Sequence, residues 1–383
     1  MISTLSSFHS LFLCTLLLQV GSGLFNNYMG LRLSADSVSE VWIGVLLSAY
    51  YLGVVCGARV GHRLIIRVGH VRASATAAVL SICLILLQSL IDEKAIWLVL
   101  RVCAGMTMVI QFMVLESWLN EQADNQRRGR VMSVYLLMSG VGTALGQMSL
   151  TLYPTLDLRP LIFVAMCQAV GLLPIVLTTR TLPAAQLPAP IALGYFLKAV
   201  PQSLLTVLLA GNICGAFHGL AAVYAVKHNL STTQVALYTA ATVTAGLLSQ
   251  WPMGWLSDRV NRGNLVRVNA LLLCGLTFML WGWVDWPYWM MLVLASAIGA
   301  LQFTLYALAS GLGNDRIDPE RRVGLTAMIL MAYGIGACLG PTLAGALMRV
   351  GGANMLYVFT SACALLLFLT MRASGRSSIG NKS

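Results

Sequence analysis

Long apolar runs recur along the whole chain, and they limit its folding options more than any other feature. Twelve runs of about 20 residues alternate with short segments that hold most of the charge. With 58% hydrophobic residues in 383, a soluble core cannot hide all of them, so we expect a polytopic membrane protein. The runs span roughly 8–31, 42–62, 71–91, 96–118, 130–153, 160–178, 203–226, 234–254, 265–284, 288–311, 323–348 and 354–372.

The length and pattern of these runs favour helices over a barrel. A membrane barrel needs strands of about ten residues in strict polar and apolar alternation, whereas these runs are twice as long and do not alternate. The first run could be a signal peptide, but it lacks a basic segment before it, so we expect a retained first helix. The sequence therefore predicts an all-α membrane protein with twelve transmembrane helices.

The net charge of +11 is distributed in a way that predicts topology. If both termini are cytoplasmic, 18 of the 24 basic residues fall in inner segments and five in outer loops. That is the bias of a membrane protein in this orientation. We therefore expect contact with the lipid bilayer and no nucleic acid, and we expect both termini on the cytoplasmic side.

Two observations weaken an enzymatic reading. All nine cysteines fall inside the expected spans, at no metal-ligand spacing, and are best read as small packing residues. The sequence also lacks the HExxH, GxSxG, Walker and EF-hand patterns. We expect no metal, no cofactor and no enzymatic activity.

An internal repeat divides the chain into two halves. Residues 120–147 and 314–341 are identical at 9 of 28 positions when aligned without gaps, at a shift of 194 residues. The expected domains are an N-terminal six-helix bundle (1–178), a Pro-rich cytoplasmic linker (179–202) and a C-terminal six-helix bundle (203–383). Duplicated bundles are typical of transporters that expose a midplane site to each side in turn.

Several segments resemble the major facilitator superfamily. "GWLSDRVNR" at 254–262 resembles its GxLxDRxGR signature, with Asn261 in place of the usual Gly, and "RVCAGM" at 101–106 resembles its RxxxG motif. "GVGTALGQ" and "GIGACLGP" resemble its glycine-rich motif. "LES" at 115–117, "RGR" at 128–130, "ALGQ" at 144–147 and "QWPMG" at 250–254 are similar to its bacterial YcaD-like branch.

The resemblance implies a cytoplasmic gate around Asp258. Its carboxylate is expected to meet the start of the fifth helix near Gly129 and Arg130, since a carboxylate at a helix N-terminus gains about 0.3–1 kcal/mol. The alternative is a solvent pair with Arg259 or Arg262. Ile66 replaces the acid in the N-terminal copy of the signature, which implies an asymmetric gate.

Ionisable residues inside the spans are expensive and usually functional. The resemblance to the RxxxG motif implies that Arg101 is an anion or carbonyl anchor, or a charge that tunes proton movement. The alternative is a side chain that snorkels to the interface or bonds to carbonyls. Glu116 lies 15 residues later, about 22 Å along a helix, so the two cannot pair directly. We expect Glu116 to pair with Arg130 or Arg67 in the gate, with a proton-carrying or substrate role as the alternative.

Uncharged polar residues predict the rest of a substrate cavity. Gln302, Tyr306 and Ser310 are spaced by four residues and share a helix face, as Gln19 and Asn26 do at a spacing of seven. Such faces should point away from lipid. Further candidates are Gln111, Asn212, His218 and Tyr224.

Glycines predict close helix packing in both halves. Small residues at a spacing of four let helices approach closely, and the resemblance implies that these surfaces lie between the halves. The candidates are Gly140, Gly142, Gly146, Gly334, Gly336, Gly340 and Gly345.

Together these features predict a secondary active transporter that moves a small neutral or anionic organic solute across a bacterial inner membrane. Proton coupling is one option, and uniport or exchange is another. We expect a monomer. The first helix has Gln19, Asn26 and Asn27 in place of a carboxylate, which argues against a lipophilic cation. The alternatives are a membrane sensor or binding protein without transport, and a multidrug exporter.

Overall fold

The computed structural model describes residues 2–91, 93–122, 128–153, 157–176, 193–318 and 321–371. These residues form α-helices joined by short turns, with one short 3-10 helix (η1, Leu150–Leu152) and no strand among them. The first six helices are α1 (Ile2–Ala35), α2 (Glu40–Val68), α3 (His70–Leu90), α4 (Lys94–Gln122), α5 (Arg128–Ser149) and α6 (Arg159–Val176).

Residues 177–192, which include the first part of the predicted linker, lie outside the described residues, and the remaining helices begin inside the linker at Leu193. They are α7 (Leu193–Ala199), α8 (Pro201–Lys227), α9 (Thr232–Ser257), α10 (Arg262–Phe278), α11 (Tyr288–Gln302), α12 (Leu305–Asn314), α13 (Arg322–Gly351) and α14 (Met355–Thr370). Nine spans in the described part of the chain are long and apolar enough to cross a membrane, α11 and α12 together forming one of them.

Local sequence explains where several helices begin. Ser39 caps α2 by accepting a bond from the Trp42 amide, and Ser231 and Gln234 form a capping box at α9. Pro201 occupies the first turn of α8, where a missing N–H costs nothing. Pro252 lies inside α9 and Pro341 inside α13, and both helices continue past their prolines.

Two predicted spans differ in detail from the structure. The ninth was expected to reach residue 284, but α10 ends at Phe278 and the Trp-rich segment after it turns back, with Gly282 at a φ of 93°. The tenth is interrupted at Phe303 and Thr304, between α11 and α12. No proline marks that interruption, which is why the apolar pattern alone did not predict it.

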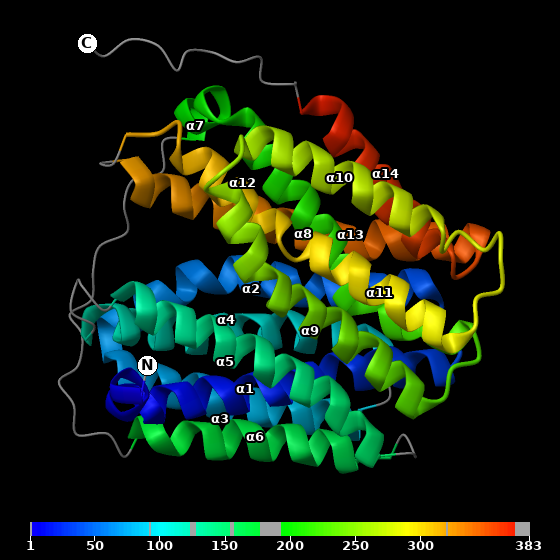
Figure 1. Cartoon of the computed structure of the whole chain (residues 1–383). Coiled ribbons are helices and arrows are strands. Elements are labelled where there is room, and N and C mark those ends of the chain that lie inside the picture. The colour runs from blue at the N-terminus through cyan, green and yellow to red at the C-terminus, as the bar shows by residue number, and fades with distance from the viewer. Residues whose placement is uncertain are drawn as a thin grey trace, which may run out of the picture.

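The helices of each half pack mainly among themselves. In the N-terminal half α1 packs on α5 and α6, and α2 on α4; in the C-terminal half α8 packs on α13, and α10 on α14. Contacts between the halves join α2 to α13, α5 to α9 and α1 to α8. Figure 1 shows α1, α3 and α6 at the bottom and α10, α12 and α14 towards the top. The domain bounds 1–178, 179–202 and 203–383 stay a prediction.

Candidate functional site

Arg101 is the most unusual side chain in the described part of the chain. It lies on α4 with 0% of its surface exposed, and none of its three guanidinium nitrogens has a hydrogen-bond partner among the described residues. The guanidinium lies over the rings of Phe25 on α1 and Tyr50 on α2, at 4.9 and 5.7 Å from the ring centroids. Such cation–π contacts compensate only part of the cost of burying a charge. Arg101 therefore does not snorkel and is not bound to carbonyls.

A small cavity of about 40 Å³ borders the same two rings. Its polar lining comes from four helices of the N-terminal half: Ser22 and Asn26 on α1, Ser81 on α3 and Gln168 on α6, with Tyr50 of α2 beside them. Its volume suits a small polar group rather than a whole organic molecule. The structure thus places Asn26, a predicted cavity residue, close to the surroundings of Arg101.

A short hydrogen-bonded chain supports this cavity. Gln111 donates from Nε2 to the Ser81 hydroxyl at 3.2 Å, and Ser81 donates to the Thr107 hydroxyl at 2.7 Å. Thr107 donates in turn to the Ala104 carbonyl. Because each of these side chains is buried and bonded, the Ser81 oxygen is held in a fixed position. Gln111, another predicted cavity residue, therefore positions the cavity wall.

The predicted C-terminal residues lie apart from this cavity. Asn212 is bonded to the Leu208 carbonyl of its own helix, and His218 lies against the Phe217 and Phe303 rings. Gln302 is buried at the end of α11 and its Nε2 has no partner among the described residues. Tyr306 packs edge-on against Tyr333 at 5.3 Å. The expected face of Gln302, Tyr306 and Ser310 is split by the interruption of the tenth span.

Two more predicted cavity residues, Gln19 and Tyr224, lie in other surroundings. Gln19 on α1 is half-buried and its Cβ lies under Gly142 of α5. Tyr224 lies near the end of α8, in a separate cavity. The sequence prediction grouped these residues with Arg101, and the structure does not bring them together.

Tyrosines that the sequence analysis did not select link the two halves near Arg101. Tyr50 and Tyr51 contact each other on α2, with ring centroids 5.4 Å apart. Tyr51 lies near Cys214 of α8 and Tyr333 of α13. The adjacent aromatic pair at 50–51 was the available signal, because a tyrosine inside a span needs a partner for its hydroxyl.

The Glu40 end is the end at which α2 begins and α1 and α8 finish. The Arg67 end is the opposite one, where α2 and α9 finish and α13 begins, and the sequence predicts that it faces the cytoplasm.

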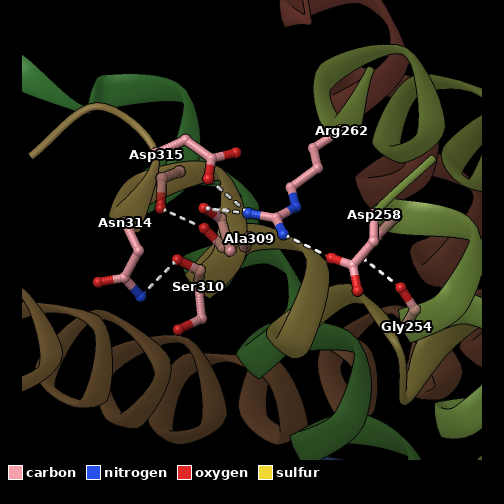
Figure 2. Close-up of polar contacts among 10 residues, drawn as sticks. Gly254, Asp258, Arg262, Ala309, Ser310, Asn314 and Asp315 are labelled. Carbon is pink, nitrogen blue, oxygen red and sulfur yellow. Dashed lines mark hydrogen bonds and ion pairs between the residues drawn. The ribbon is translucent and has the colours of Figure 1, made fainter. Parts of the chain in front are cut away.

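At the Arg67 end, Asp258 has a different partner from the one predicted. Its carboxylate pairs with Arg262 at 2.8 Å, and the other terminal nitrogen of Arg262 pairs with Asp315 at 2.6 Å and donates to the Gly311 carbonyl (Figure 2). The Asp258 side chain is 71% exposed. It therefore makes the alternative pair, with Arg262 four residues later in its own half, in place of the predicted contact with Arg130 at the start of α5.

The other predicted gate residues are also separate from Asp258. Arg259 lies over the Trp255 ring at 3.9 Å. Glu116 accepts a 3.1 Å bond from the Tyr135 hydroxyl of α5, and it forms no ion pair with Arg67 or Arg130, which are both described and exposed. The expected pairing of Glu116 was therefore wrong in its partner, because a tyrosine of the neighbouring helix is closer than either arginine.

At the Glu40 end, polar contacts connect the two halves. Glu40 on α2 pairs with Lys227 on α8 at 3.0 Å. Deeper in the molecule, Ser48 and Thr342 share a 2.7 Å bond between α2 and α13. The halves therefore hold each other at this end through specific bonds.

Glycines determine how closely the helices approach, both inside each half and between the halves. Gly142 and Gly146 let α5 approach α1, and Gly336 and Gly340 let α13 approach α8, so all four act inside one half. Between the halves the close approach is made by Gly44 of α2, whose missing side chain leaves room for the Pro341 carbonyl. The implied location between the halves is therefore wrong for these four glycines. It holds for the other three candidates, because Gly140 of α5 meets Leu247 of α9, and Gly334 and Gly345 of α13 meet Val55 and Glu40 of α2.

Comparison with known proteins gives matches along nearly the whole chain. The family model described as the Major Facilitator Superfamily matches residues 11–309 and 191–378. An uncharacterized MFS-type transporter of Enterobacter sp. (strain 638) is 27% identical over 374 residues, 95% of each chain. The uncharacterized MFS-type transporter YcaD of Escherichia fergusonii is 26% identical over 365 residues, 94% of each chain.

Solved structures share the fold at low sequence identity. The nucleoside transporter NupG has a TM-score of 0.78 at 12% identity and covers 94% of this chain and 97% of its own. A bacterial homologue of the human lysosomal transporter Spinster, inward-facing and unoccupied, has a TM-score of 0.74 at 15% identity, covering 96% and 95%. The human organic anion transporter MFSD10 has a TM-score of 0.66 at 17% identity, covering 95% and 98%.

Proposed function

Because the chain belongs to the major facilitator superfamily of membrane transporters, in its YcaD-like branch, we propose that it is a secondary active transporter. It moves a small neutral or anionic organic solute by alternating access between the two halves. The same proposal places it in a bacterial inner membrane as a monomer, with both termini cytoplasmic. A reporter fused after residue 383 tests the orientation.

The observation that carries the substrate class is the buried, unpaired guanidinium of Arg101. A buried charge without a partner costs several kcal/mol. Binding of a solute with an acceptor group would compensate this cost, because the acceptor would bond to the guanidinium. Arg101 lies between α1, α2 and α4, close to the tyrosines that face the other half. An acceptor oxygen is the group that a guanidinium recognises.

The proposed gate is argued from the contacts at the two ends of the molecule. The bonds at the Glu40 end hold the halves together there, while Asp258 at the Arg67 end is held by Arg262 of its own half. We propose that in the opposite state Asp258 leaves Arg262 and meets the start of α5. A difference of about 1.4 kcal/mol between these arrangements changes the populations tenfold.

Counterflow in proteoliposomes tests the transport proposal directly. A panel of nucleosides, organic acids, sugars and organic cations should yield at least one neutral or anionic solute that exchanges in the parent chain. Arg101→Ala should abolish its exchange and Arg101→Lys should weaken it, since an ammonium keeps the charge without the planar fork.

Arg267→Ala supplies the matched control for that experiment. Arg267 also lies over an aromatic ring, that of Phe368 at 4.7 Å, and its Nε is also buried without a partner. It stands on α10 against α14, away from the contacts between the halves. Its removal should leave exchange intact; equal losses in both variants would contradict a specific role for Arg101.

Two other functions have distinct outcomes in the same assay. A sensor or binding protein without transport would bind solutes tightly but exchange none of them. A multidrug exporter would exchange lipophilic cations and keep doing so without Arg101. This proposal involves no metal site and no known catalytic motif, and we do not propose an enzyme.

A further inference from the structure

A second cavity, of about 470 Å³, opens at the Glu40 end of the C-terminal half. It lies between the end of α8, the start of α14 and the segment that joins α10 to α11, which loops out at the right edge of Figure 1. Its volume falls in the range of small-molecule sites. None of its lining residues belongs to the cavity near Arg101.

Aromatic rings form one part of the lining. The His228 ring lies 4.2 Å from the Tyr224 ring, and its Nδ1 is hydrogen-bonded to the Tyr224 carbonyl at 2.9 Å. Tyr224 is held from behind by the Tyr357 ring, edge-on at 4.8 Å. Trp286 donates from its indole nitrogen to the Met279 carbonyl at 2.8 Å. These rings are fixed before any ligand arrives, so they offer a preformed apolar surface.

Opposite charges form another part of the lining. Lys227 and Asp285 both border the cavity. Asp285 forms no ion pair within the described residues, whereas Lys227 pairs with Glu40 of the other half at 3.0 Å. Asp285 is therefore available to a ligand, whereas Lys227 already takes part in the contact that closes this end.

We propose that this cavity binds a small aromatic molecule that carries both a carboxylate and an amine. The amine pairs with Asp285, the ring packs against Tyr224 and Trp286, and the carboxylate takes Lys227 from Glu40. Binding therefore breaks a contact between the halves and favours opening of the Glu40 end. This consequence rests on the proposed transport function, whereas the binding itself does not.

The exchange of partners at Lys227 is energetically accessible. The Lys227 side chain is 51% exposed and that of Glu40 18%, so solvent screens the pair from the Lys227 side and weakens it. Removing the competing carboxylate by Glu40→Gln should therefore strengthen binding of an acidic ligand by about 1.4- to fivefold.

Three matched probes and the full-length protein in lipid nanodiscs test the proposal. Phenylalanine carries both charged groups, 3-phenylpropionate only the acid and phenethylamine only the amine. Tryptophan fluorescence reports binding, and Trp286→Phe should remove the signal while keeping a ring in place. We expect phenylalanine to bind most tightly, Lys227→Gln to lower its affinity to that of phenethylamine, and Asp285→Asn to lower it to that of 3-phenylpropionate.

The Glu40→Gln variant gives the decisive comparison. It should tighten binding of phenylalanine and 3-phenylpropionate and leave phenethylamine unchanged, and phenylalanine should increase the labelling of a cysteine introduced at Ser48 in the parent chain. Equal affinities for all three probes, or a signal that survives Trp286→Phe, would overturn the proposal. Arg101→Ala separates the two sites: it should abolish transport and leave phenylalanine binding unchanged, and loss of both would place the probe at the Arg101 site instead.

Discussion

The side-chain amide of Asn27 on α1 donates a 2.7 Å hydrogen bond to the hydroxyl of Thr239 on α9, from one half of the molecule to the other. Both side chains are buried. The Thr239 hydroxyl also donates to carbonyls of its own helix, so it would stay satisfied without Asn27, whereas the amide of Asn27 would lose its acceptor. The bond therefore joins α1 to α9, and its loss would leave the Asn27 amide, but not the Thr239 hydroxyl, without its partner.

This relationship predicts a measurable coupling. In a double-mutant cycle of Asn27→Ala and Thr239→Ala, the interaction should contribute about 0.5–1.5 kcal/mol to the free energy of unfolding in detergent. Thr242 is the matched control, because it is buried on the same helix and, among the described residues, its hydroxyl bonds only to the Tyr238 carbonyl. A cycle with Thr242→Ala should show no coupling; a similar value in both cycles would mean that the loss is not due to the bond.

Arg101→Met should separate stability from transport. Replacing an unpaired buried charge with an apolar side chain of similar length removes a desolvation cost, so we expect a gain of about 1–4 kcal/mol in the free energy of unfolding. Exchange in proteoliposomes should be lost. Thermal unfolding of both proteins in the same detergent checks the first part, and a less stable variant would show that Arg101 has partners that compensate its charge.

Gly44→Ala should disturb the contact between the halves. A β-carbon there would meet the backbone of Pro341 on α13, which cannot move aside as a side chain can. We expect a loss of about 1–3 kcal/mol or a shift towards opening at the Glu40 end, seen as greater cysteine labelling near Ser48. Gly275→Ala on α10 is the control, because its β-carbon would meet nothing within 4 Å, and it should gain up to about 1 kcal/mol.

Arg262→Gln and Asp258→Asn should shift the gate in opposite directions. Without Arg262 the Asp258 carboxylate is released from its own half and can meet α5, so cysteines at the Arg67 end should become less accessible. Asp258→Asn removes that contact, so accessibility should rise. Arg259→Gln should change little, because Arg259 contacts only the Trp255 ring among the contacts described above. Shifts of the same sign in the first two variants would contradict the gate.

Glu116→Gln should reveal whether this carboxyl carries a proton. If transport is proton-coupled through Glu116, the variant should keep solute counterflow but lose accumulation driven by a pH gradient. Tyr135→Phe removes the hydroxyl that bonds to Glu116 and should weaken accumulation less. Accumulation that is unchanged in both variants would remove Glu116 from the coupling mechanism and leave uniport or exchange.

Much of the fold could be predicted from hydropathy and repetition. The lengths of the apolar runs exclude other architectures in lipid, and the repeat around Arg127 and Arg321 indicates two related halves. The exception, at the tenth span, has a physical reason. Its helix is interrupted where side chains from other helices supply hydrogen bonds to its carbonyls, and such support from distant segments leaves no local pattern in the sequence.

The candidate site was predicted less completely. Arg101 stands out in the sequence because charge inside a span is costly, but its neighbours Phe25 and Tyr50 are ordinary apolar or aromatic residues of other spans. Polar residues of the C-terminal half were grouped with it by type and helical spacing, but none of them lines the cavity beside Tyr50. The partner of Asp258 depends on which of two nearby cations it reaches, and a motif does not determine that.

The interruption between α11 and α12 has a mechanical consequence. Gln250 of α9 and Asn269 of α10 donate to the carbonyls of Phe303 and Leu301 there, and Ser249 donates to that of Ala300. These bonds come from two neighbouring helices and hold the interruption in place. The ten residues of α12 form a separate short helix beyond it. Because these side-chain hydrogen bonds can exchange partners, α12 can change its angle to α11 while α11 stays helical. Such a movement would displace Asp315, which follows α12, and with it the Arg262 guanidinium that pairs with Asp315.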